Sequence, residues 1–459
     1  MLLALTAWPA AQTASNTALL GRFDPVDDYN DVWGYVAPDG REYALLGANN
    51  GTYVLDCTDP TIPTERAFIA GPRACCRDIR TYRDYAYVVS DAPTGGALQI
   101  IRLTDPDNPV LVNEWSAAFT SAHNVTIDTT TGRLYASGTT GPSPIVDIAT
   151  DPENPVAIGS MGGTYIHDMQ VQNGVAHVAR IFDSEYQSVD VSNPTAVTGL
   201  GTASVTVAHN AWPTRDDRFV VTCSESRGGF LSVFDISNPR LPRLVSTWRT
   251  GPSTAVPHNA LLLDRVAHVS WYGEGYRVLD LADPANPVEI GFFDDSTAGG
   301  FLGNWGVYPF QPSGVVYLSD RQLGFYTLDV SARSTRYGEA TPGTGGIAPT
   351  IRPFGAAYRG NPNFELQMEA APPGAAFALL LGVRGPLPVG PGLQILIDLS
   401  QPFFLVNGVT DASGNARIGV PIPAATPAVT LAAQFFAVDP AGAFNLTATR
   451  GLEFAVFAP

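Results

Sequence analysis

A pattern of apolar and polar positions recurs through the first 330 residues of the chain. Each copy has two apolar residues, an Asp and a turn that usually contains Pro, as in VLDCTDPTIP (54–63), VFDISNP (233–239) and VLDLADPANP (278–287). Neighbouring copies lie 43 to 49 residues apart, and the residues at the Asp position are Asp56, Arg102, Asp147, Asp190, Asp235, Asp280 and Asp329. Asp or Asn followed by Pro ends a strand and begins a turn. The pattern therefore predicts a repeating unit of about 45 residues.

Each unit also contains a short stretch of alternating character, such as YAYVVS (85–90), VAHVAR (175–180) and VAHVSW (266–271). Alternation of this kind predicts a strand packed between neighbours. Four short strands in each unit of about 45 residues are typical of a β-propeller blade. Seven units closing into a ring would leave no exposed sheet edge. We therefore expect an all-β protein with a seven-bladed β-propeller over residues 17–332.

The segments outside the repeat have their own character. Residues 333–352 are rich in Gly, Pro, Thr and Ser and predict a linker. Residues 353–459 contain about six strand-like runs, no His and no Cys, and predict a small β-sandwich for attachment, spacing or interaction. Residues 1–16 contain a short apolar run and then small residues, like the end of a signal peptide without its basic start. We expect an extracellular, cell-surface or periplasmic protein.

Composition narrows the possible partners. The 459 residues carry a net charge of −17, and an acidic surface repels nucleic acid and anionic lipid. Beyond the N-terminus, the apolar runs fall short of the roughly 18 to 20 residues that span a bilayer. We therefore expect no nucleic-acid partner and no transmembrane segment. The partner we expect is an extracellular ligand or protein of unknown identity.

Four of the six histidines occupy the same position in the repeat, just before the alternating stretch. Each is followed by Asn or Asp, as in SAHN (121–124) and YIHD (165–168). The residues that we assign to this position lie 42 to 49 apart along the chain: Trp33, Arg77, His123, His167, His209, His258 and Trp305. This position belongs to the innermost strand of a blade. We therefore predict that these seven side chains form a ring at one mouth of a central channel.

Converging imidazoles suit Zn²⁺, Cu²⁺ or Fe²⁺. The candidate ligands of one such metal are His123, His167, His209, His258, Asp78 and Asp168. The two carboxylates could instead accept hydrogen bonds from imidazole N–H groups. The alternative is a structural role, with the histidines bonded to Asp residues such as Asp56 and Asp147 or lining a water-filled channel. His177 and His268 take the place of Tyr87 and Tyr135 in the alternating stretch and are expected to be strand residues.

Two smaller groups of residues leave alternatives open. Asp27, Asp28 and Asp31 either bind Ca²⁺ or lie in a solvated loop. The cysteines Cys57, Cys75, Cys76 and Cys223 allow three disulfide pairings in an oxidising compartment. Their spacing lacks a CxxC pair, which argues against metal ligation by cysteine.

Several segments together resemble the LVIVD-repeat proteins, and more closely the choice-of-anchor B family. The resemblance spans residues 27–331 and includes CRDIR (76–80), AHNAW (208–212), YGEGYRVLD (272–280) and GNWGVYPFQPSG (303–314). It implies an exported or cell-surface propeller and no particular activity. The chain departs from the family at Cys76, where Trp is usual, and at Pro257, where Asp is usual. The first departure leaves a thiol close to the expected ring, and the second removes a carboxylate.

Two classes of function therefore remain open. The first is a secreted or cell-surface binding or scaffold module with a His-lined channel. The second is a metal-dependent hydrolase or oxidoreductase whose transition metal is held by the channel histidines. The sequence contains no GxSxG, GxxxxGK[ST] or HExxH motif that would decide between them.

Overall fold

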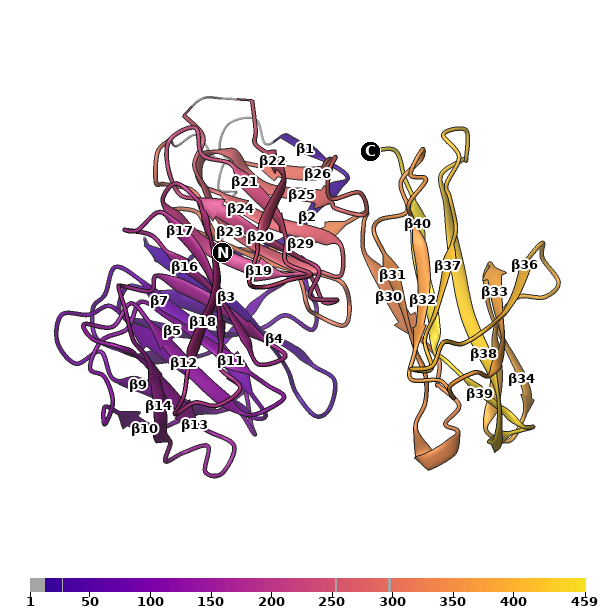
Figure 1. Ribbon diagram of the computed structural model, residues 1–459, viewed down its shortest axis with the longest axis horizontal. Coiled ribbons are helices and arrows are strands. Elements are labelled where there is room, and N and C mark those ends of the chain that lie inside the picture. Colours follow the sequence, from indigo (N-terminus) through magenta and orange to yellow (C-terminus); the bar gives the residue numbers. More distant parts are fainter. Residues whose placement is uncertain (1–12, 27, 252–253, 296–298) are drawn as a thin grey trace, which may run out of the picture.

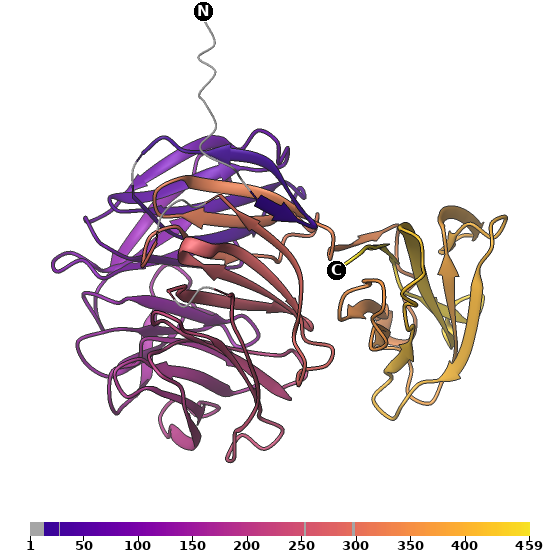
Figure 2. The same ribbon diagram turned by 90° about the horizontal axis from the view of Figure 1, so that it is seen from above.

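The computed structural model describes residues 13–26, 28–251, 254–295 and 299–459 of the chain. These residues form strands and two short 3₁₀ helices, η1 (Tyr272–Glu274) and η2 (Thr344–Gly346). Figures 1 and 2 show two bodies, a larger one built from the repeat and a smaller C-terminal one beside it. The all-β class is therefore confirmed, whereas residues 1–12 of the expected signal segment lie outside the described residues.

The larger body is a set of antiparallel sheets, each built from consecutive strands of one repeat. The first sheets along the chain contain β3 (Tyr29–Val36), β4 (Glu42–Ala48), β5 (Gly51–Asp56) and β6 (Thr64–Ala70); β7 (Arg77–Tyr82), β8 (Tyr85–Ser90), β9 (Leu98–Arg102) and β10 (Val110–Trp115); and β11 (Asn124–Asp128), β12 (Arg133–Ser137), β13 (Ser143–Asp147) and β14 (Val156–Met161). The next contain β15 (Asp168–Gln172), β16 (Val175–Arg180), β17 (Glu185–Asp190) and β18 (Thr198–Ser204); and β19 (Ala208–Pro213), β20 (Phe219–Ser224), β21 (Leu231–Asp235) and β22 (Arg243–Trp248).

The last two sheets of this body take a strand from the N-terminus. β23 (Pro257–Leu263), β24 (Val266–Trp271), β25 (Gly275–Asp280) and β26 (Val288–Asp294) are extended by β1 (Thr13–Ser15). β27 (Asn304–Tyr308), β28 (Val316–Asp320) and β29 (Gly324–Val330) are completed by β2 (Thr17–Phe23), with Thr17 opposite Val330. The sheets thus begin at residue 13, four residues before the predicted boundary at 17.

The first strands of the sheets form a closed ring. Each contacts the first strand of the next sheet, in the order β3, β7, β11, β15, β19, β23, β27 and back to β3. Apolar side chains fill the space between neighbouring sheets, as where Val89 and Ile100 pack against Leu134 and Val146. Ring closure therefore places equivalent positions of successive repeats around one axis.

The Asp of the repeat ends the third strand and shapes the turn that follows. A carboxylate oxygen of Asp56 accepts the Thr58 N–H at 2.9 Å, and Asp147 accepts the Ala149 N–H at 2.8 Å. The same contact joins Asp235 to Ser237 at 2.9 Å. These carboxylates accept hydrogen bonds from the turns that follow the third strands. They are therefore not the structural hydrogen-bond partners of the histidines that the alternative prediction required.

The C-terminal body contains three sheets, and the two larger ones share an apolar core. One has the order β30 (Ser334–Tyr337), β40 (Gly451–Val456), β38 (Val429–Ala443), β33 (Ala376–Gly382) and β36 (Phe404–Val409), with β39 (Leu446–Ala448) beside β38. The other consists of β31 (Thr350–Phe354), β32 (Glu365–Glu369) and β37 (Ala416–Gly419), and β34 (Arg384–Gly390) pairs separately with β35 (Leu393–Ile397). Leu366 and Met368 pack with Leu379 and Phe435 between the sheets.

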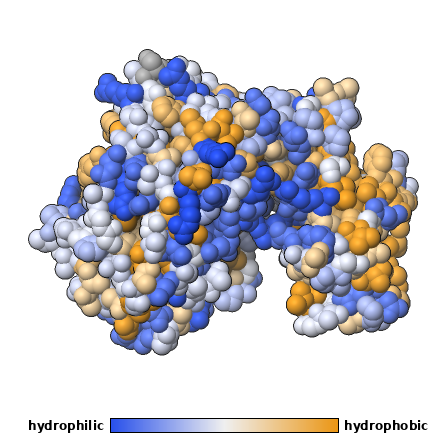
Figure 3. All heavy atoms as spheres, in the orientation of Figure 1, coloured by the Kyte–Doolittle hydropathy of each residue, from blue (hydrophilic) through white to orange (hydrophobic). Residues whose placement is uncertain are grey.

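Part of the predicted linker belongs to this body. β30 pairs with β40 from Ser334 to Tyr337, because the edge of β40 offers unpaired backbone groups at that point. The linker in the structure is therefore shorter than the predicted range 333–352. Apolar side chains are also exposed on this body, as Figure 3 shows, and they include Phe404 and Val409 on the edge strand β36.

Candidate functional site

Four histidine rings lie in an unbroken row where the first strands begin. The ring centroids are 4.5 Å apart for His123 and His167, 4.2 Å for His167 and His209, and 4.3 Å for His209 and His258. The Trp305 ring continues the row at 4.3 Å from His258. We call the four imidazoles the imidazole row. The structure thus brings together five of the seven side chains assigned to the ring.

Backbone carbonyls of the next sheet fix the orientation of two imidazoles. His167 Nδ1 lies 3.1 Å from the carbonyl oxygen of His209, and His258 Nδ1 lies 2.6 Å from that of Trp305. A carbonyl only accepts, so Nδ1 carries the proton and Nε2 of the neutral ring keeps its lone pair. Burial and neighbouring imidazoles hold the pKa of both rings well below the usual range. Both rings are therefore neutral and can act as ligands.

Glu225 completes a group of three potential ligands with two members of the imidazole row. The group has one ligand atom from each residue, and the three atoms lie within 4.8 Å of one another: His209, His258 and Glu225. His209 Nε2 is 3.7 Å from a Glu225 carboxylate oxygen, and the Tyr272 hydroxyl donates to the other oxygen at 2.7 Å. His258 Nε2 is buried and has no hydrogen-bond partner. Burial lowers the pKa of His209, while Glu225 and Asp168 oppose that effect.

Glu225 was not among the predicted site residues, because it does not share the position of the four histidines in the repeat. Glu225 follows the second strand, β20, directly. The residues at the same place after β8, β24 and β28 are Asp91, Tyr272 and Arg321. All four recur with the period of the repeat, and that periodicity could have revealed them.

Arg77 is one of the residues that line the channel cavity, and its guanidinium is held by hydrogen bonds. Its guanidinium donates to the carbonyls of Ala48 at 3.0 Å and Pro72 at 2.6 Å, and to the Gln99 side chain at 3.4 Å. It is 1% exposed, and burial lowers its pKa to about 10. Arg77 lines the same cavity as His123, His209 and His258, and its guanidinium also holds the loop before β7.

Trp33 lies further along the channel than predicted. Trp33 is the fifth residue of β3, whereas Arg77 is the first residue of β7 and His209 the second of β19. Asn30, the second residue of β3, therefore lies nearer the start of its strand than Trp33 does, and Trp33 lies beside Arg80. The Arg80 guanidinium lies over the Trp33 ring at 4.0 Å from its centroid.

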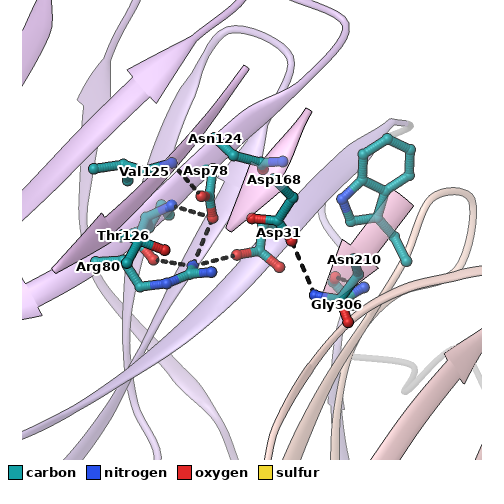
Figure 4. A network of polar contacts seen from close by, with 12 residues as sticks. Asp31, Asp78, Arg80, Asn124, Val125, Thr126, Asp168, Asn210 and Gly306 are labelled. Carbon is teal, nitrogen blue, oxygen red and sulfur yellow. Dashed lines mark hydrogen bonds and ion pairs between the residues drawn. The ribbon is translucent and has the colours of Figure 1, made fainter. Parts of the chain in front are cut away.

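Asp78 and Asp168 belong to a buried polar network one residue beyond the imidazole row (Figure 4). Arg80 donates to Asp78 at 2.6 Å and to Asp31 at 3.2 Å. The other Asp78 oxygen accepts the Val125 N–H at 2.7 Å, and Asp168 accepts from the Asn210 amide at 2.9 Å. Both carboxylates therefore join one sheet to the next, and the three-ligand group lies elsewhere.

In three of the four His-Asn or His-Asp pairs, the second residue has this joining role: Asn124, Asp168 and Asn210. Asn210 accepts the Ala260 N–H at 3.1 Å, and Asn124 donates to the His167 carbonyl at 3.0 Å. Burial raises the pKa of Asp168, with Arg80 and Asn210 opposing it. The first residue of the pair thus faces the channel and, in these three pairs, the second fastens neighbouring sheets.

The remaining candidates are accounted for by other contacts. His177 and His268 lie in β16 and β24, with Nδ1 at 2.8 Å from the Tyr186 hydroxyl and 2.6 Å from the Tyr276 hydroxyl, as expected of strand residues. Of the three Asp residues considered for Ca²⁺, Asp31 is paired with Arg80, Asp28 lies 3.6 Å from Arg321, and Asp27 lies outside the described residues. All four cysteines are free thiols.

The channel at this level is narrow. Its cavity has a volume of about 20 Å³ and is lined by members of the imidazole row and of the polar network, including His209, His258, Asp78 and Arg80. A volume of this size holds one water or one ion. The site is therefore suited to a small ligand or to one group of a larger ligand.

The fold and the closed ring of first strands define a β-propeller. Among solved structures, the chain is similar to the β-propeller domain of Cps50 (Swd1) from Myceliophteria thermophila, with a TM-score of 0.50 and 9% identity over 68% of this chain and 98% of that chain. No protein-family model matches the chain, and no curated protein matches it. Within the part of the chain that the structure describes, no helix is long and apolar enough to cross a membrane.

Proposed function

We propose that this protein is an exported seven-bladed β-propeller of the choice-of-anchor B type, followed by a β-sandwich, and that it acts as a binding module. The LVIVD-type repeat and the motifs around the imidazole row support the family. The apolar N-terminal run supports export. Propellers serve many functions, so the binding site has to be argued from its residues.

The binding site is the end of the channel at the imidazole row, and its ligand includes one transition metal. Two observations carry this proposal: within the described residues, the buried Nε2 of His258 has no hydrogen-bond partner, and one ring nitrogen of His258 lies within 4.8 Å of ligand atoms of His209 and Glu225. A buried lone pair without a donor is costly unless something fills the site. Imidazole nitrogen and carboxylate oxygen together suit Zn²⁺, Cu²⁺ or Fe²⁺.

Metal content tests this proposal directly. We expect about one ion per chain after purification without chelator or affinity tag and reconstitution with Zn²⁺, Cu²⁺ and Fe²⁺ in turn. Glu225→Gln and His258→Gln should each lower the affinity by more than about tenfold, because each removes a ligand. His268→Gln is the matched control, since His268 is also buried in the same sheet and bonded to Tyr276.

Circular dichroism and the unfolding midpoint show whether each variant folds. A wild-type protein that takes up none of the three metals contradicts the metal centre, and so does full retention in folded Glu225→Gln. The binding-module proposal would then rest on a channel without metal.

A metal-dependent hydrolase or oxidoreductase is the second candidate. Three protein ligands leave a coordination position open, as in catalytic zinc sites and non-haem iron sites. The Tyr272 hydroxyl, 2.7 Å from the Glu225 carboxylate, stands beside that group as a proton donor, and burial and Glu225 raise its pKa well above the usual range. Turnover by the metal-loaded protein that is lost in Tyr272→Phe, with the metal retained, would support this candidate.

A further inference from the structure

Two adjacent cysteines lie at the same end of the channel, on the loop that joins β6 to β7. Cys76 is buried and packs against Val256, Tyr272 and Trp305, which come from other sheets of the ring. Cys75 is exposed, and its thiol sulfur lies 3.9 Å from the Arg321 guanidinium. The loop therefore holds one thiol inside the channel end and the other at its surface.

Asp91 lies beside these two cysteines and is hydrogen-bonded to the backbone of Cys76. One carboxylate oxygen accepts the Cys76 N–H at 3.0 Å, and the Asp91 N–H donates to the Cys76 carbonyl at 3.2 Å. The other carboxylate oxygen lies 3.6 Å from His123 Nδ1. The two sulfur atoms and a carboxylate oxygen all lie within 4.8 Å of one another. The contacts of Asp91 with both neighbours keep this arrangement in place.

The surroundings favour the ionised form of one thiol. A hydrogen bond from Cys76 lowers the pKa of Cys75 to about 6, and the nearby Arg321 adds to this effect. The pKa of Cys76 is raised, first by its hydrogen bond to Cys75 and then by burial. Cysteine binds a metal as the thiolate, so binding of a cation to both sulfurs would release thiol protons.

We propose that Cys75, Cys76 and Asp91 form a second cation site, which binds a thiophilic divalent cation of the zinc class. Two thiolates and a carboxylate belong to the ligand set of Zn²⁺, whereas monovalent copper prefers soft ligands alone. Their three negative charges outweigh the single positive charge of Arg321. His123 lies next to the second oxygen of the Asp91 carboxylate and orients that carboxylate. The site differs in ligand chemistry from the group of His209, His258 and Glu225.

Titration with Cd²⁺ tests this site separately from the first one, because only thiolate ligands give sulfur-to-cadmium charge transfer in the near ultraviolet. The full chain is kept reduced with a phosphine, and its free thiols are counted before titration. We expect one equivalent of Cd²⁺ to develop the band and an equal amount of Zn²⁺ to suppress it. Cys75→Ser and Cys76→Ser should each abolish the band, and Asp91→Asn should weaken binding by about tenfold or more.

Two variants serve as controls in this titration. Cys57→Ala removes a buried thiol from a different part of the ring and should keep the band. Glu225→Gln removes a ligand of the first site and should also keep it, so failure of one site is distinguishable from failure of the other. The proposal is overturned if the reduced wild type gives no band, or if the double variant Cys75→Ser/Cys76→Ser retains it.

Discussion

At the scale of single residues, the hydrogen-bond partner of Nδ1 decides what each histidine does. His177 and His268 are both buried beside a tyrosine hydroxyl, and burial lowers the pKa of each to about 3. The imidazoles of His167 and His258 are also buried and neutral, but their Nδ1 atoms donate to backbone carbonyls, so that the lone pair lies on Nε2. The partner of Nδ1, rather than burial, thus separates the candidate ligands from the strand residues.

The depressed pKa of His177 predicts a dependence of stability on pH. The unfolded histidine takes up a proton near pH 6.5, whereas the folded one stays neutral until about pH 3. Unfolding therefore takes up a proton between these values, and this contribution to stability falls by about 1.4 kcal/mol for each pH unit as the pH drops from 6.5 toward 3. His177→Gln should remove that part of the slope in urea unfolding measured between pH 6 and pH 4.

The comparison with a variant is needed because other groups titrate in the same range. Burial raises the pKa of Asp280 and Asp320 to about 6, so these carboxyls favour the folded state as the pH falls. Their contribution is the same in wild type and variant and cancels in the difference. If the free energy of unfolding changes equally with pH in wild type and variant, His177 is not neutral in the folded state.

At the scale of elements, the sheets are fastened to one another where their first strands begin. Asp78 accepts a hydrogen bond from the backbone of β11, and Asp168 accepts one from the Asn210 side chain of β19. Arg80 lies between Asp78 and Asp31 and so joins β7 to β3. Burial, and then the nearby Asp78, raise the pKa of Asp31 well above its usual range, and Arg80 opposes this effect.

Loss of that cation should destabilise the ring strongly. Arg80→Met leaves two buried carboxylates without their partner, and breaking a buried ion pair in this way costs about 3–5 kcal/mol. Arg66→Met is the matched control, because Arg66 pairs with Asp56 at 2.7 Å on the surface with 39% of its side chain exposed. That change should cost less than about 1 kcal/mol. Urea unfolding of both variants measures the difference, and equal losses would contradict the importance of the network.

At the scale of the whole molecule, the N-terminal strands hold the ends of the ring together. β2 lies beside β29, more than 300 residues away in the chain, and its Gly21 lies close to the loop after β5. A Cβ on Gly21 would come within 2.4 Å of the Pro60 carbonyl oxygen, whereas a Cβ on Gly162 would meet nothing within 4 Å. Closure therefore needs a residue without a side chain at position 21.

Gly21→Val should loosen this closure. Overpacking typically costs about 1–3 kcal/mol, so we expect a lower unfolding midpoint and faster proteolysis near β2. Gly162→Val should leave both quantities nearly unchanged. A Gly21→Val protein as stable and as protease-resistant as Gly162→Val would show that the contact at β2 does not contribute to closure.

The sequence by itself determined the repeat, the all-β class and the phase of the histidines. These follow from local rules, since alternation specifies strands, Asp-Pro turns end them, and a constant period gives equivalent residues equivalent places around a ring. The same rules explain why His177 and His268 could be assigned to strands.

Only the tertiary structure decided which side chains meet. Trp33 lies four residues into β3 and packs under Arg80, and the carbonyls of Ala48 and Pro72 hold the guanidinium of Arg77. Glu225 and Asp91 follow second strands, and the pairing of the first two strands of their own sheets brings them to His209 and to the two cysteines. His258 reaches Glu225 from the neighbouring sheet. Such contacts depend on side-chain direction and on residues from different repeats, which a period along the chain does not specify.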